Sequence, residues 1–150
     1  MFKAERILFP TDFSDCSMSV LDYVTGFAAA NKAKLYLMHV MAYEDLPKVA
    51  DAPKPVPPDA KRVQEIKEEL EGLIKKSEGF EIECSVVQGH AFNEIIRAAE
   101  KISADIIIMA THGRTGFDQI LIGSVAEKVV RHAACPVLTI KPPKECMRHS

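Results

Sequence analysis

The chain has 150 residues, of which 47% are hydrophobic and 27% charged, and its formal net charge at neutral pH is −2. These values are typical of one globular domain with a single core, so we take residues 1–150 as one domain. The slightly acidic balance argues against non-specific nucleic-acid binding. No apolar run approaches the roughly 18 residues of a membrane span, and the N-terminus lacks the features of a secretory signal. The sequence therefore predicts a cytoplasmic protein that binds neither nucleic acid nor membrane.

The N-terminal third predicts two buried strands with a helix between them. The apolar run from Arg6 to Phe9 is followed by Pro10 and predicts the first strand. Ser14 is suited to cap a helix over about 15–31, in which apolar residues recur at helical spacing. The second strand is expected from Lys34 to Met41, and its two apolar faces suit a parallel sheet covered by helices on both sides.

A proline-rich stretch, residues 44–60, separates the second strand from the next helix. It holds Pro47, Pro53, Pro55, Pro57 and Pro58, which disfavour helix and predict an extended excursion. Two interpretations remain open for it. The first is a gate or partner-docking segment at the mouth of a ligand site, and the second, which we favour slightly, is a tolerated surface insertion.

The rest of the chain continues the alternation of helices and strands. We expect a helix over about 60–77, a half-buried strand Phe80–Val87 near an edge of the sheet, a helix over 91–102, a strand over 105–110, a helix over about 124–133 and a strand Pro136–Ile140. The tail, residues 142–150, is polar and expected to fray. Strict alternation predicts an α/β fold with a doubly wound, five-stranded parallel sheet in the order 3-2-1-4-5.

In that strand order the first and fourth strands are neighbours, and ligands bind beside their carboxyl ends. Asp12 follows the first strand, and the glycine-rich loop 109–124 follows the fourth. Gly113 and Gly123 would let an anion approach the backbone, and the helix that begins at Ser124 would present free N–H groups to it. The alternatives are a loop without a ligand and, for Asp12, a helix cap.

Long segments of the chain resemble the universal stress protein family. They are "RILFPTDFSDCSMSVLDYV", "LMHVM" and "ADIIIMATHGRTGFDQILIGSVAEKVVRHAACPVLTIK". Nucleotide-binding members carry G-x-x-G, nine residues and G-[ST]. This chain matches at Gly113, Gly123 and Ser124 but has Ala110 in place of the first glycine, so we expect retained but weaker binding.

The resemblance implies a Rossmann-like fold, a homodimer and a bound adenine nucleotide, ATP or AMP, with Mg²⁺ as a possible companion of ATP. The implied nucleotide-binding residues are Pro10, Thr11, Asp12, Val40, Met109, Ala110, Gly113, Arg114, Gly123, Ser124 and Val125. The implied function is that of an adenine-nucleotide sensor in stress response or signalling. Two alternatives are a slow ATPase of the same fold and a dimerisation module that binds no nucleotide.

Catalytic and metal-binding groups are not indicated. Asp118 could approach the phosphates, but a solvated loop charge is the favoured interpretation, and His39 and His112 are expected to be satisfied within the core rather than to form a metal site with Asp12. Cys16, Cys84, Cys135 and Cys146 form no C-x-x-C pair, which predicts free thiols. We expect the homodimer to form through the last strand, Pro136–Ile140, whose short apolar edge invites pairing with a second copy.

Overall fold

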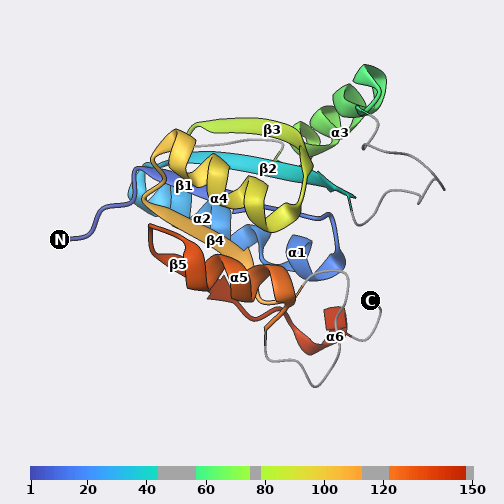
Figure 1. Ribbon diagram of the computed structural model, residues 1–150. Helices are drawn as coiled ribbons and strands as arrows, with labels where there is room; N and C mark the ends of the chain where they lie inside the picture. Colours follow the sequence, from blue (N-terminus) through green and yellow to red (C-terminus); the bar gives the residue numbers. More distant parts are fainter. Residues whose placement is uncertain (44–56, 75–78, 113–121, 148–150) are drawn as a thin grey trace.

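The computed structural model describes residues 1–43, 57–74, 79–112 and 122–147 of the chain (Figure 1). The elements are β1 (Arg6–Pro10), α1 (Asp15–Ser19), α2 (Leu21–Asn31), β2 (Lys34–Ala42), α3 (Ala60–Leu73), β3 (Ile82–Gly89), α4 (Ala91–Ile102), β4 (Ile106–Ala110), α5 (Ser124–His132), β5 (Val137–Ile140) and α6 (Lys144–Met147). Among the described residues, no helix is long and apolar enough to cross a membrane.

The five strands form one parallel sheet in the order β3-β2-β1-β4-β5, as the alternating pattern predicts. β1 is central, with Ile7 opposite Leu35 of β2 on one side and opposite Ile106 of β4 on the other. β3 and β5 are the two edge strands, which confirms the edge positions expected for them.

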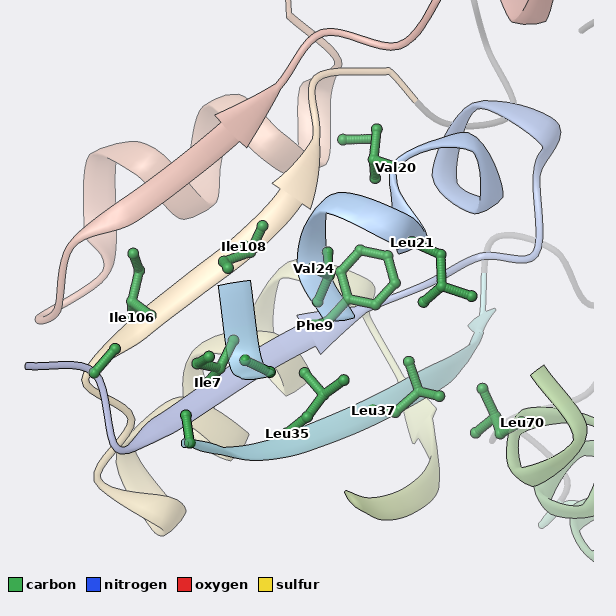
Figure 2. Packing of buried hydrophobic residues seen from close by; sticks show 14 residues of the cluster. Ile7, Phe9, Val20, Leu21, Val24, Leu35, Leu37, Leu70, Ile106 and Ile108 are labelled. Atoms are coloured by element: carbon green, nitrogen blue, oxygen red, sulfur yellow. The ribbon is translucent and has the colours of Figure 1, made fainter. Parts of the chain in front are cut away.

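Side chains that alternate along the strands separate two hydrophobic layers. On one face, Ile7 and Phe9 pack with Val24 of α2 and belong to the same cluster as Leu70 of α3 (Figure 2). On the other face, Leu8 belongs to a cluster that includes residues of α4 and α5. Because both faces are covered, β1 and β4 must be apolar on both sides, and Ile7, Leu8, Phe9, Ile107 and Ile108 are almost fully buried.

The predicted helix over 15–31 is in fact two helices, which corrects the single-helix expectation. Ser14 caps α1 as predicted, because its hydroxyl oxygen accepts from the N–H of Ser17 at 3.1 Å. Val20, with φ −97° and ψ 0°, is the C-cap of α1 and the N-cap of α2, and its side chain is fully buried. The chain therefore changes from one helix to the next at a buried apolar residue.

The tail also differs from expectation, since part of it is ordered against the domain. Pro142 is buried and residues 144–147 form α6, which contacts α1. Smaller corrections concern boundaries: the predicted helix over 60–77 ends at Leu73, and the predicted strand 80–87 runs from Ile82 to Gly89. Residues 44–56, most of the proposed gate, lie outside the described residues.

Candidate functional site

A pocket of about 680 Å³ lies at the carboxyl ends of the strands, where β1 and β4 are neighbours and the strand order reverses. Its volume is within the range of small-molecule sites. Its described lining consists of Pro10, Thr11, Asp12, Ser17, Val40, Ala42, His90, Ala91, Phe92, Asn93, Ile95, Met109, Ala110, Thr111, His112, Gly123, Ser124, Val125, Ala126 and Lys128. The strand ends and the starts of α4 and α5 therefore meet around one cavity.

Thr11 fixes the β1 end of the pocket. Its backbone N–H donates to the carbonyl of Met38 at 2.8 Å, which extends the β1–β2 pairing by one residue. Its hydroxyl oxygen accepts from the N–H of Phe13 at 3.1 Å and from the hydroxyl of Ser17 at 2.9 Å. With 4% of its surface exposed, Thr11 holds the turn after β1 in one conformation.

Asp12 sits in that turn and lines the pocket. One carboxylate oxygen accepts from the N–H of Ser14 at 2.9 Å, while Ser14 itself caps α1. The cap of α1 is thus Ser14 and not Asp12, which decides against the cap interpretation. Phe13 follows with φ 60°, in the left-handed region that costs a non-glycine residue energy, so the turn is held against local strain by its side-chain hydrogen bonds.

His39 supports the same turn from β2. Its Nδ1 lies 2.9 Å from the carbonyl oxygen of Thr11, and its ring lies 4.7 Å from that of Phe13. Because a carbonyl only accepts, Nδ1 carries the proton in this bond. His39 is 7% exposed and is a satisfied core histidine, in agreement with the sequence interpretation.

Gly123 joins the β4 end of the pocket to α5. Its N–H donates to the carbonyl oxygen of Thr111 at 2.6 Å, and a Cβ at this position would lie 3.2 Å from the same oxygen. Gly123 is the N-cap of α5 and makes no side-chain cap. The first N–H groups of α5, at Ser124 and Val125, therefore begin at the pocket wall without a side-chain acceptor on the N-cap.

The start of α4 forms a second wall that the sequence analysis missed. His90 is the N-cap of α4 without a side-chain cap bond, and Ala91, Phe92 and Asn93 line the pocket. A Cβ at Gly89, just before it, would lie 2.6 Å from the side chain of Glu94, which would then have to move. The sequence contained a signal for this wall, because the carboxyl ends of parallel strands lie at the same edge of a sheet. Gly89 ends β3 beside the end of β2, so the helix that follows it begins at that edge.

The electrostatics of the described lining favour an anion near the helix starts. Two helix N-termini, each with a partial positive charge, border one cavity. Asp12 and Lys128 are the lining residues with full charges in the described part of the chain. Within those same residues, no group of three or more His, Cys, Asp or Glu could hold a metal ion.

The pocket brings together most of the residues that the resemblance singled out. Those that line it are Pro10, Thr11, Asp12, Val40, Met109, Ala110, Gly123, Ser124 and Val125. Gly113 and Arg114, and also Asp118, lie outside the described residues. His112 lines the pocket as well, 5% exposed, with its Nδ1 2.8 Å from the Thr111 hydroxyl.

Comparison with known proteins connects this architecture to one family. The model of the universal stress protein family matches residues 3–141. Universal stress protein MJ0531 of Methanocaldococcus jannaschii is 34% identical, over 94% of this chain and 84% of its own length. Universal stress protein MJ0577 of the same organism is 33% identical, over 91% of this chain and 94% of its own.

Solved structures agree with the sequence relatives. A structure of MJ0577 has a TM-score of 0.69 at 30% identity and covers 94% of this chain and 98% of its own. A universal stress protein in complex with cAMP has a TM-score of 0.68 at 22% identity, covering 94% and 99%. A universal stress protein from Archaeoglobus fulgidus in complex with dAMP has a TM-score of 0.62 at 23% identity, covering 94% and 100%. From the matched family, the relatives and the fold together, the chain belongs to the universal stress protein family.

Proposed function

We propose that the pocket binds an adenine nucleotide, ATP or AMP, and that the protein acts in the cytoplasm as a stress-response or signalling sensor of that nucleotide. One observation carries the proposal. A cavity of about 680 Å³ at the reversal of strand order combines a carboxylate with the uncapped start of a helix. A nucleotide needs both features, because its nucleoside offers hydroxyl and amino donors while its phosphates seek N–H groups and positive potential.

The roles follow from where each residue lies. Asp12 would accept from the nucleoside, with Pro10 and Thr11 beside it. Val40, Met109 and Ala110 would lie along the base and sugar, and the N–H groups of Gly123, Ser124 and Val125 would bind phosphate. Gly113 and Arg114 remain expected phosphate contacts on the same grounds of resemblance.

The ligand class is supported by structures of the same fold. Two of them are described as complexes with cAMP and with dAMP, both of which are adenine nucleotides.

Isothermal titration of the protein with ATP, AMP and adenosine, with and without Mg²⁺, tests the proposal. Saturable binding of ATP or AMP is expected. The Asp12→Asn variant keeps an oxygen for the Ser14 N–H but loses the charge. A hydrogen bond to an ionised group contributes about 1.5–3 kcal/mol and a neutral one about 0.5–1.5 kcal/mol, so the loss is about 1–1.5 kcal/mol. We therefore expect about 5- to 12-fold weaker binding, while Asp22→Asn, on the exposed surface of α2, serves as control. Folded protein that gives no heat with either nucleotide at millimolar concentration rejects the proposal.

Phosphate release measured in the same samples separates a binding protein from a slow ATPase. We expect binding without turnover beyond the rate of the Asp12→Asn variant. Steady release from ATP and Mg²⁺ that this variant abolishes would instead support the ATPase alternative.

We also propose a homodimer that forms through β5. β5 is an edge strand, and the apolar side chain of Leu138 on it is 39% exposed. Pairing with a second copy would bury this side chain and satisfy the free edge. Pairing around a twofold axis would make the contact self-complementary. Light scattering at tens of micromolar should give the dimer mass for the natural chain and the monomer mass for Leu138→Glu. A natural chain that is monomeric, or a dimer that Leu138→Glu leaves intact, refutes this interface.

A further inference from the structure

Two cysteines far apart in the sequence meet where α6 packs on α1. The thiol of Cys16 in α1 donates to the carbonyl oxygen of Cys146 in α6 at 3.3 Å, across 130 positions of the chain. α1 and α6 are in contact, although the sequence predicted a frayed tail there. The docking of α6 therefore places the second cysteine beside the first.

The two thiols differ in their surroundings. Cys16 is 1% exposed, whereas Cys146 is partly exposed. Burial raises the pKa of the Cys16 thiol, and the negative charges of Cys146, Asp12 and Asp15 raise it further. The influence of Cys146 agrees with the contact just described, since electrostatic effects weaken with distance. Cys146 is thus the more exposed residue of the two, and Cys16 is its buried neighbour.

The remaining two cysteines have no comparable arrangement. Cys84 lies on β3 and Cys135 lies just before β5, at opposite edges of the sheet. Four strand spacings of about 4.8 Å separate these edges, far more than the roughly 7 Å that a disulfide tolerates between Cα atoms. Cys84 and Cys135 are therefore matched internal controls for any reaction of the Cys16–Cys146 pair.

We propose that Cys16 and Cys146 are an oxidative modification site: a hydroperoxide converts them into a reversible disulfide that ties α6 to α1. The thiolate of Cys146 attacks one peroxide oxygen and breaks the O–O bond, forming a sulfenic acid; with hydrogen peroxide, the other oxygen leaves as water after protonation. The sulfur of Cys16 then attacks the sulfenic sulfur as its thiol loses its proton, the S–O bond breaks, and the leaving hydroxide takes up a proton to depart as a second water. Two thiols lose two electrons and two protons in total, and one peroxide is reduced to two waters.

The position of the bond gives it a structural consequence at the pocket. Cys16 precedes Ser17, whose hydroxyl donates to the Thr11 hydroxyl oxygen at 2.9 Å, and both Ser17 and Thr11 line the pocket. The disulfide would fasten the end of the chain to the short helix that borders the nucleotide-sized cavity. The proposed oxidation does not depend on what the pocket binds, so it can be tested on the protein alone.

The test treats the reduced full-length protein with an equal concentration of hydrogen peroxide, blocks free thiols by alkylation and digests without reductant. Mass spectrometry should find tryptic residues 7–32 joined to residues 145–148, with two hydrogen atoms lost. Dithiothreitol should remove the link. On a non-reducing gel the oxidised chain should migrate as a faster monomer.

Variants assign the bond and keep the test decisive. Cys146→Ser, at a partly exposed position, should reduce the intramolecular link to background, whereas Cys84→Ser and Cys135→Ser should retain it. Cys16→Ser should behave like Cys146→Ser, and the natural chain still gives the answer if burial of Cys16 makes that variant unstable. Overoxidation of Cys146 without a link, a covalent dimer in place of the internal bond, or a link through Cys84 or Cys135 would overturn the proposal.

Discussion

Gly123 offers the sharpest test of how an anion reaches the start of α5. Its φ of −68° is available to any residue, so the requirement for glycine comes from space and not from backbone conformation. A Cβ would lie 3.2 Å from the carbonyl oxygen of Thr111, closer than an ordinary contact. In the absence of ligand, we expect α5 to relieve this contact with a small shift. A bound phosphate would oppose the shift, because it needs the N–H groups of Ser124 and Val125 in place.

The sizes of the effects can be estimated from this geometry. Overpacking of this kind costs about 1–3 kcal/mol, and each 1.4 kcal/mol is about tenfold in Kd. We therefore expect Gly123→Val to weaken nucleotide binding by about 5- to 150-fold, and Gly123→Ala by less. Ser124→Ala removes one hydrogen bond, worth about 0.5–1.5 kcal/mol, and should weaken binding only about 2- to 10-fold.

Isothermal titration with ATP and AMP measures these differences, and circular dichroism with urea denaturation checks that each variant is folded. Gly26→Ala is the matched control, because its Cβ would meet no atom within 4 Å and its site is in α2. That substitution should leave Kd unchanged and raise stability by about 0.5–1 kcal/mol through helix propensity. A folded Gly123→Val variant that binds as well as Ser124→Ala would show that no anion approaches the backbone here.

Three further predictions concern the same end of the molecule. Lys128→Gln removes the positive charge on the described pocket lining and should weaken the binding of ATP about 2- to 5-fold and that of AMP less. The control Lys101→Gln on α4 should change the affinity for neither nucleotide. An equal loss of affinity for both nucleotides with Lys128→Gln would contradict a phosphate contact. Ala110→Gly restores the glycine of the family pattern and should tighten binding, so an unchanged or weaker Kd would show that the methyl group does not limit the approach. The raised pKa of Cys16 means that the folded state holds the thiol proton more tightly than the unfolded state does. The thiol therefore contributes to stability below its ordinary pKa, and this contribution is lost as the pH rises through its raised pKa in the folded state. Urea midpoints in reducing buffer should therefore fall less between pH 8 and pH 10 for Cys16→Ser than for the natural chain, and parallel curves would contradict this.

The sequence by itself determined the order and type of the main elements. The apolar runs and helical spacings are local signals, and strict alternation leaves few ways to arrange a parallel sheet. The strand order 3-2-1-4-5, the edge positions of β3 and β5 and the limits of α4 were all predicted correctly. The meeting of the Asp12 turn with Gly123 and Ser124 was also predictable, because the fold places the carboxyl ends of β1 and β4 side by side.

Only the tertiary structure decided the features that depend on contacts between distant segments. Helical spacing continues through Val20, so the local pattern did not predict that one helix would end and another begin there. The start of α4 lines the pocket because β3 ends beside β2. Part of the polar tail forms α6, which packs on α1. Cys16 and Cys146 had no sequence pattern in common. Their proximity exists because α6 docks on α1, and periodicity along a chain carries no information about such a contact.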